Sequence, residues 1–224
     1  MKQEDLGLVR SDFTDLVPSQ QALVTSVARA KPESELPYSL IKGYLNSAQQ
    51  KALITESVTY PFTRPEVCVY GSQHPIPRSQ VWFADKGCDY VYSGLFIHAL
   101  PWPKYAYKLR QKLAREFGLN SNGVLVNRYA DGHESMGWHS DDEKEIEAGS
   151  DIASVTLGAS RDFFLRHKKT QQKISLCLDS GDLLIMHWPM QADWEHSLPK
   201  RLKVTEPRLN LTFRRLIVGF HQTP

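Results

Sequence analysis

Residues 208–214 read RLNLTFR, in which polar and apolar side chains alternate without interruption. A period of two residues predicts a β-strand with one polar face and one apolar face. We expect Leu209, Leu211 and Phe213 to pack inward between two sheets, while the polar residues line the opposite face. In an ordinary half-exposed strand the polar face is only hydrated, so the two arginines at its ends require a further explanation.

After Gly118 the sequence consists of short segments with β-strand patterns, separated by Gly, Asp, Ser and Pro clusters. The predicted strands are Gly123–Tyr129, Ile152–Leu157, Asp162–Arg166, Lys173–Leu178, Asp182–His187 and Arg208–Val218. Six short strands at this spacing favour a sandwich or jelly roll over alternating β and α units. The predicted fold class is α+β, mainly β, with a jelly-roll core over residues 119–220.

Two helices are predicted before these strands. Ser47 and Gln50 have the spacing of a capping box, which opens a helix that ends near Ser57. The second helix covers residues 103–117, with Pro103 in its first turn and Gly118 at its C-terminal cap. Residues 1–36 are the least patterned, and we expect a partly disordered extension there, followed by a single domain over residues 37–224.

Composition sets wide limits on function. The chain has 224 residues, of which 41% are hydrophobic and 23% charged, as in an ordinary soluble enzyme or binding module. No apolar stretch is long enough to span a bilayer or to serve as a signal core, so we expect no membrane partner. We expect a cytoplasmic location in a bacterium or a nuclear one in a eukaryote. Three widely spaced cysteines favour free thiols over disulfides.

The charge pattern is local rather than global. A net charge of +2 is too small to indicate a nucleic-acid partner. Six basic residues lie between Pro199 and Arg215, whereas Asp141–Glu145 is acidic. These runs predict separated surface patches of opposite sign, although solvated faces are the commoner interpretation.

A metal site is indicated by His139-Ser140-Asp141, because side chains at i and i+2 of an extended segment point to the same side. His196 is a third candidate ligand on a facing strand. Two imidazoles and one carboxylate on one face of iron leave three positions open. Alone, such a tripeptide is weak evidence, since most histidines are structural or merely exposed.

The polar face of residues 208–214 strengthens the metal hypothesis. Arg208 and Arg214 can bracket a dicarboxylate and a neighbouring metal, because guanidinium groups pair with carboxylates at two points. Asn127 and Tyr129 share a face of another predicted strand, and each can hydrogen-bond a carboxylate oxygen. 2-Oxoglutarate is such a dicarboxylate. The alternative is a buried asparagine and a packing tyrosine.

Four motifs occur in a characteristic order: Asn127–Gly132, His139–Glu143, His196–Pro199 and Arg208–Arg214. Together they resemble the AlkB family of Fe(II)/2-oxoglutarate-dependent dioxygenases, especially the second and third human AlkB homologues and their bacterial relatives, over about residues 66–219. The resemblance implies a double-stranded β-helix (jelly roll) core with supporting N-terminal helices and a nucleotide-recognition lid within residues 37–118. It also implies that Fe(II), 2-oxoglutarate and O2 are used to dealkylate 1-methyladenine and 3-methylcytosine in DNA, with release of formaldehyde, succinate and CO2.

The same resemblance assigns site residues. The implied iron ligands are His139, Asp141 and His196. The implied 2-oxoglutarate residues are Asn127, Tyr129, Arg208, Asn210, Thr212 and Arg214, with Arg208 and Tyr129 at the distal carboxylate and Asn127 and Arg214 nearer the metal-bound end. The implied substrate-binding residues are Tyr70, Arg78, Tyr90, Tyr92, Ser93, Asp142 and Glu143.

The substrate residues have distinct expected roles. A base damaged on its pairing edge must be flipped out, and Tyr92 would stack on it while Tyr90 reaches toward backbone or the acidic residues. Asp142 and Glu143 would favour the positive charge of a methylated base. Tyr70 would fill the gap in the duplex, and Arg78 would meet a phosphate. Without the resemblance, these are half-buried tyrosines, a solvated acidic turn and ordinary surface cations.

The expected partner is alkylated DNA, single- or double-stranded, with RNA as an alternative, and we expect a monomer. One rival function is RNA demethylation or protein-directed oxidation by the same chemistry. Another is a non-catalytic nucleic-acid-binding module, which predicts a missing ligand where all three are present. A third is a cupin-like metalloprotein without 2-oxoglutarate, which gives Arg208 and Arg214 no shared purpose.

Overall fold

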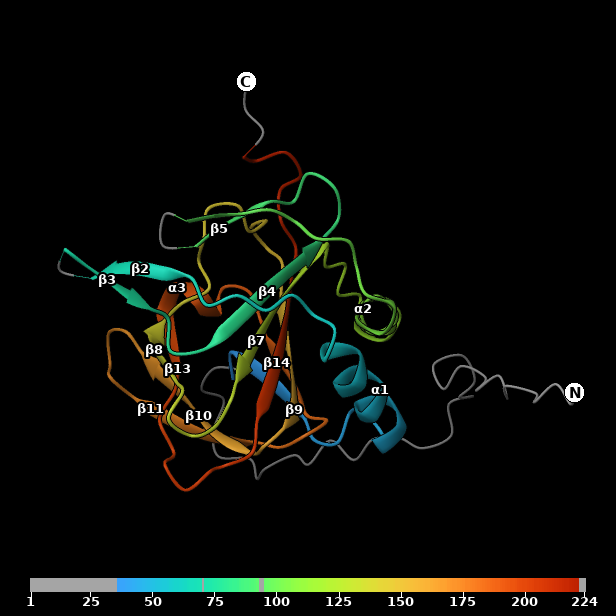
Figure 1. The fold of residues 1–224 in the computed structure, drawn as a ribbon. Helices are drawn as coiled ribbons and strands as arrows, with labels where there is room; N and C mark the ends of the chain where they lie inside the picture. Colours follow the sequence, from blue (N-terminus) through green and yellow to red (C-terminus); the bar gives the residue numbers. More distant parts are fainter. Residues whose placement is uncertain (1–35, 70, 93–94, 222–224) are drawn as a thin grey trace, which may run out of the picture.

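The computed structural model describes residues 36–69, 71–92 and 95–221, and its core consists of two facing antiparallel sheets (Figure 1). The six-stranded sheet has the order β1 (Tyr38–Ile41), β12 (Leu183–Met186), β9 (Ile152–Gly158), β14 (Arg208–Arg214), β7 (Gly123–Tyr129) and β4 (Ser79–Ala84). The four-stranded sheet has the order β11 (Lys173–Leu178), β10 (Arg161–His167), β13 (Trp194–Leu198) and β8 (Met136–His139). The predicted fold class, mainly β with a jelly-roll core, is confirmed.

Smaller elements flank the two sheets. The helices are α1 (Ser47–Ser57), α2 (Lys104–Phe117) and α3 (Met190–Asp193), and two hairpins join β2 (Glu66–Val69) to β3 (Ser72–Pro75) and β5 (Tyr90–Tyr92) to β6 (Leu95–Ile97). None of the helices in the described ranges is long and apolar enough to cross a membrane. Residues 1–35, where we expect the N-terminal extension, lie outside the described residues.

Both long helices form where the sequence predicts them, with different N-terminal caps. The capping box of α1 lies one residue earlier than expected: Asn46 accepts from the Gln49 N–H at 2.9 Å, and Gln49 accepts from the Asn46 N–H at 3.1 Å. Pro103 is the N-cap residue of α2 and supplies no side-chain cap. The Glu56 carboxylate of α1 takes that role, because it accepts the first backbone N–H groups of α2 at 2.8 and 3.1 Å.

The two faces of β14 are oriented opposite to our expectation. Leu209, Leu211 and Phe213 pack with Leu53 of α1 and Leu109 of α2 in one buried cluster, so the apolar face of β14 is covered by helices. The polar face therefore looks into the space between the two sheets. A period of two residues identifies two faces, but it does not reveal which one a helix will cover.

Several strand boundaries also differ from the prediction. β14 ends at Arg214 rather than at Val218, and within residues 215–221 Leu216 alone forms an isolated bridge. β1 and β4 precede residue 119 and still join the six-stranded sheet, so this sheet extends beyond the core range expected from the sequence. β4 shows no polar and apolar alternation, because both of its faces are buried.

A close backbone approach holds the segment that leads into β14. The Gly132 N–H donates to the Val204 carbonyl at 2.8 Å, and the Arg201 N–H donates to the Gly132 carbonyl at 2.8 Å. A Cβ atom on Gly132 would lie 1.7 Å from the Arg201 carbonyl oxygen, whereas one on Gly137 of β8 would meet nothing within 4 Å. Only a glycine fits the first position without displacing backbone.

We therefore expect Gly132→Ala to lower the free energy of unfolding by about 1–3 kcal/mol or more, because the added methyl group must push backbone aside. The matched Gly137→Ala variant should differ from wild type by less than about 0.5 kcal/mol. Urea denaturation followed by fluorescence measures both values. Equal stability of the two variants would show that the approach of residues 132 and 201 does not constrain the fold.

Candidate functional site

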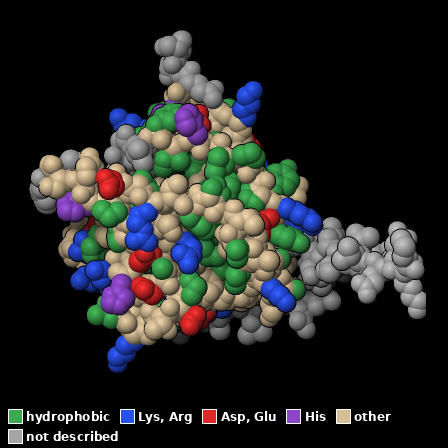
Figure 2. Space-filling model, in the orientation of Figure 1, with side chains coloured by type: hydrophobic (Ala, Val, Ile, Leu, Met, Phe, Trp, Pro, Cys, Tyr) green, Lys and Arg blue, Asp and Glu red, His purple; other side chains and the backbone are tan. Residues whose placement is uncertain are grey.

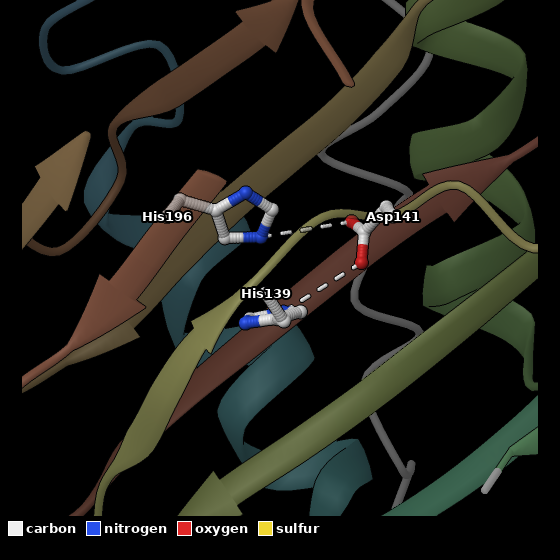
Figure 3. A group of neighbouring side chains, drawn as sticks. All are labelled: His139, Asp141 and His196. Atoms are coloured by element: carbon white, nitrogen blue, oxygen red, sulfur yellow. Dashed lines mark ion pairs between the residues drawn. The ribbon is translucent and has the colours of Figure 1, made fainter. Parts of the chain in front are cut away.

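Two histidines and one aspartate meet between the sheets (Figure 3). β8 pairs with β13 so that His139 and His196 are Cα partners, and Asp141 follows β8 by two residues. His139 Nε2 lies 3.7 Å from Asp141 Oδ1, and His196 Nε2 lies 4.0 Å from Asp141 Oδ2. One ligand atom from each of the three residues lies within 4.8 Å of the others. The structure thus brings together the three metal ligands expected from the sequence.

The charge state of this group suits a divalent metal ion. Burial alone raises the pKa of Asp141, but the charges of Arg214 and the two imidazoles outweigh it and lower this pKa to about 2. Burial, with a smaller contribution from His139, lowers the pKa of His196 to about 3. At neutral pH the group therefore offers a carboxylate and a neutral imidazole, which are the forms that bind metals.

Neighbouring side chains fix the segment that carries Asp141. The Asp141 N–H donates to Gln191 Oε1 at 2.9 Å, and the Ser140 hydroxyl donates to the Trp194 carbonyl at 3.0 Å. Gln191 is buried in α3, just before β13. These contacts connect the Asp141 segment to α3 and to the start of β13, the strand that carries His196. They therefore fix the distance between Asp141 and His196.

One pocket contains the metal group and the residues predicted for the co-substrate. The co-substrate residues that line it are Asn127, Tyr129, Arg208, Asn210, Thr212 and Arg214. They come together because the register of β7 and β14 places Asn127 opposite Asn210 and Tyr129 opposite Arg208. Side chains two residues apart on each strand then share the face that looks between the sheets.

Arg208 is a buried cation that no carboxylate of the described residues neutralises. Its side chain is 2% exposed, and its Nη2 donates to Thr156 Oγ1 at 2.9 Å and to Asn210 Oδ1 at 3.0 Å. Burial lowers the pKa of Arg208 to about 10; Tyr129 opposes this effect in part, and no carboxylate among the described residues does so. The Arg208 Nε has no hydrogen-bond partner among the residues that the structure describes. An arginine in this state fits a bound carboxylate.

Arg214 differs from Arg208 because protein carboxylates already neutralise it. Its Nη2 donates to Asp141 Oδ1 at 2.7 Å, and its Nη1 lies 3.5 Å from Glu143 Oε1. Its Nη1 also donates to the Tyr90 hydroxyl at 2.7 Å. Both arginines face the pocket, and Arg214 contacts the Asp141 carboxylate there, whereas Arg208 has no carboxylate partner among the described residues. That the two arginines bracket a dicarboxylate stays a prediction.

Apart from Arg78, the substrate residues expected from the sequence separate into three groups. Tyr90 and Glu143 line the pocket, and the Tyr90 hydroxyl donates to the Glu143 carboxylate. The Asp142 side chain is 65% exposed and lies outside the pocket lining. Tyr70 and Ser93 fall outside the described residues, as does the side chain of Tyr92.

Arg78 requires a correction. It is 2% exposed, lines the same pocket and donates from Nε to Asn127 Oδ1 at 3.0 Å. This burial does not fit the phosphate contact expected from the sequence, because a phosphate of the nucleic-acid backbone would meet an exposed cation. The contact instead places Arg78 beside a predicted co-substrate residue.

Two residues of β9 that contact the pocket's side chains were missed, and one of them, Ser154, lines the pocket. Ser154 donates to Asn210 Oδ1 at 3.0 Å and lines the pocket, and Thr156 accepts from Arg208. Both are small hydroxyl residues spaced two apart in the otherwise apolar strand Ile152–Gly158. That spacing, beside the polar face of β14, was the signal that could have identified them.

The basic run within residues 199–215 does not form the surface patch expected from the sequence. Arg208 and Arg214 are buried, while Arg201 and Arg215 form ion pairs with acidic side chains at 2.5 and 2.6 Å. Figure 2 shows basic and acidic side chains interspersed on the face in view. Local pairing has therefore replaced the separated patches of opposite sign.

Comparisons with known proteins agree with this geometry. Residues 37–214 match the 2OG-Fe(II) oxygenase superfamily. The DNA oxidative demethylase ALKBH2 of Bos taurus is 43% identical over 159 residues, which are 67% of this chain and 57% of that protein. ALKBH2 of Homo sapiens is 42% identical over 160 residues, which are 68% of this chain and 61% of that protein.

More distant relatives share the fold. The alpha-ketoglutarate-dependent dioxygenase alkB homolog 3 of Mus musculus is 33% identical over 176 residues, which are 74% of this chain and 56% of that protein. The solved structure of OsALKBH1 superposes with a TM-score of 0.55 at 18% identity, over 82% of this chain and 100% of that one. The chain therefore spans about six-tenths of the length of the curated relatives it matches.

The metal group leads to a first test of the site. We expect Asp141→Asn to weaken Mn(II) binding at least tenfold, because it removes the only carboxylate of the group, and even changes around metal ligands cost about 10–100-fold in affinity. Electron paramagnetic resonance of free Mn(II) during a titration measures this constant. The neighbouring, exposed Asp142→Asn is the matched control and should stay within about twofold of wild type. Equal affinity of the two variants would remove Asp141 from the metal site.

Proposed function

The chain belongs to the 2OG-Fe(II) oxygenase superfamily and, within it, to the AlkB family, and we propose that it removes alkyl groups oxidatively from N-alkylated bases of DNA. Its cofactor is Fe(II), and 2-oxoglutarate and O2 are its co-substrates. The observation that carries the proposal is a single pocket that combines a His/Asp/His donor set with a buried arginine, Arg208, which no carboxylate of the described residues neutralises.

We assign His139, Asp141 and His196 as the iron ligands. Two imidazoles and one carboxylate on one face of the metal leave positions for co-substrate and oxygen. When bound, Fe(II) supplies the oxidising chemistry, in which O2 and 2-oxoglutarate are consumed and a C–H bond of the alkyl group is hydroxylated. The protein holds the ligands, orients the alkylated base and excludes water. The contact between Arg214 and Asp141 keeps the carboxylate in place.

We assign Arg208 to the distal carboxylate of 2-oxoglutarate. The guanidinium carbon lies 5.6 Å from the centre of the Tyr129 ring, so the tyrosine borders the same carboxylate site. Asn127, Asn210 and Thr212 line the pocket beside it and can hydrogen-bond the co-substrate oxygens. A bound carboxylate would neutralise the Arg208 guanidinium, which pairs with no carboxylate of the described residues.

Glu143 is our assignment for recognition of the damaged base. It follows the metal ligand Asp141 by two residues and is held by Tyr90, while its Oε2 has no hydrogen-bond partner among the described residues. That oxygen can accept a hydrogen bond from the exocyclic amine of 1-methyladenine or 3-methylcytosine, and its charge favours these cationic bases. A base must leave the duplex to reach this depth, since the pocket lies between the sheets.

The two hairpins before α2 are our candidates for the nucleotide-recognition lid. The β5–β6 hairpin carries Tyr90 and Tyr92. In the sequence, Tyr70 lies between β2 and β3. We assign Tyr92 and Ser93 to the flipped base and Tyr70 to the gap that the base leaves in the stack. Relatives named DNA oxidative demethylase support DNA as the substrate, and we propose that the protein acts on it as a monomer, in the nucleus if its source is a eukaryote.

The function is tested by incubating the full chain with Fe(II), 2-oxoglutarate and oligonucleotides that carry 1-methyladenine. We expect one formaldehyde per repaired base in DNA, because the hydroxylated N-methyl group collapses to an aldehyde and the free base. Single-stranded DNA, duplex DNA, RNA and a methylated peptide are compared, with unmethylated DNA as the control. Formaldehyde from RNA alone would indicate an RNA demethylase, and formaldehyde from the peptide alone would indicate a protein-directed oxygenase. No formaldehyde with any nucleic acid would refute base repair.

A further inference from the structure

Three side chains at one edge of the six-stranded sheet form a serine–histidine–aspartate chain. The Ser39 hydroxyl lies 2.7 Å from His187 Nε2, and His187 Nδ1 lies 2.9 Å from Asp151 Oδ2. A carboxylate only accepts hydrogen bonds, so the proton of the ring lies on Nδ1. In the neutral imidazole Nε2 is then an acceptor for the serine proton. This is the arrangement of nucleophile, general base and orienting acid found in serine hydrolases.

The topology explains why these residues meet. β1, β12 and β9 are consecutive neighbours, and Ser39 is the Cα partner of Ile185, while Met186 is the partner of Ile152. His187 and Asp151 directly extend the β12–β9 pairing, so all three side chains fall on neighbouring strands. The Trp188 N–H donates to Asp151 Oδ1 at 2.8 Å and thereby holds the acid in its orientation.

This group lies on the other face of the sheet from the iron site. Ile185 and Ala153 belong to the cluster under the helices, and His187 and Asp151 are each two residues away from one of them. Side chains two apart in a strand share a face. Met186, on the opposite face, lines the iron pocket. The sheet therefore separates the two groups, and the oxygenase chemistry makes no use of Ser39.

The three side chains are accessible from solvent. Ser39 is exposed, and the side chains of His187 and Asp151 are 39% and 31% exposed. Asp151 also lines a separate, mainly polar cavity of about 300 Å³, whose lining includes neither Ser39 nor His187. Ser121 in the lining of that cavity is buried, and its hydroxyl has no partner among the described residues.

The edge position of β1 also supplies a donor for a developing negative charge. The His187 N–H donates to the Pro37 carbonyl at 2.9 Å, just before β1 begins. In an antiparallel pair every second residue directs its backbone N–H and C=O groups at the partner strand, so the backbone groups of Ser39 point toward β12. The Leu40 N–H then points away from β12, and in the described part of the chain β1 has no second neighbouring strand. A backbone N–H directly after the nucleophile can stabilise an oxyanion.

We propose that Ser39, activated by His187 and Asp151, is the nucleophile of a second active site that transfers acyl groups from small carboxylic esters to water. Ser39 Oγ attacks the ester carbonyl carbon while His187 Nε2 takes its proton. The ester C–O bond then breaks, and the departing alkoxide receives that proton. Water attacks the acyl group on Ser39 with His187 as base, and the proton returns to Ser39 Oγ as the carboxylic acid leaves.

The test is covalent labelling of the full chain with a fluorophosphonate, in which the Ser39 Oγ–P bond forms and fluoride leaves. Mass spectrometry of the Ser39 peptide gives the rate. We expect His187→Gln to slow labelling at least about 100-fold, since a general base contributes about 10²–10⁴-fold. Asp151→Asn should slow it at least about tenfold, and hydrolysis of p-nitrophenyl acetate should fall in parallel. Ser39→Ala should abolish both signals.

Two controls make the outcome decisive. Ser160→Ala removes another exposed serine, which donates to Asp179 at 2.6 Å without a histidine, and should leave labelling unchanged. A chelator should also leave it unchanged, which separates this site from any metal-dependent hydrolysis. The proposal is overturned if Ser39 reacts no faster than Ser160, or if His187→Gln labels at the wild-type rate, in which case the three side chains only fasten the edge strand.

Discussion

Arg208 carries a positive charge into the space between two β-sheets, where burial lowers its pKa to about 10 and no carboxylate of the described chain balances it. A buried ion without a partner costs several kcal/mol, even after the protein has relaxed around it. Hydrogen bonds to Thr156 and Asn210 offset part of this cost. We propose that a bound anion neutralises this charge, and that the anion binds in the pocket beside the proposed metal ligands.

The arrangement of sheets and helices places this charge beside the His/Asp/His group. Helices α1 and α2 cover the apolar face of β14, which leaves the polar face free to look between the sheets. The pairing of β8 with β13 brings His139 and His196 to the facing wall, and Arg214 connects Asp141 to that arrangement. The six-stranded sheet thus contributes the two arginines of β14, the four-stranded sheet contributes the two histidines, and the pocket lies between the sheets.

Much of this was predictable from the sequence, for identifiable reasons. The spacing of His139 and Asp141 and the alternation around Arg208 are local signals, and the structure places these residues together. Long-range packing is not local, so the helix-covered face of β14 was assigned the wrong way round. β4 was missed because both its faces are buried, and the surface role of Arg78 failed because burial cannot be read from a single charged residue.

Calorimetry of 2-oxoglutarate binding tests the central claim most directly, with wild type and Arg208→Met compared in the presence of Mn(II). We expect the variant to bind 2-oxoglutarate about 10–100-fold more weakly, because a charge-assisted contact is lost. We also expect the ligand-free variant to be at least as stable to urea as wild type, because an uncompensated buried charge is gone. Unchanged affinity, or a ligand-free variant that is much less stable, would contradict the account.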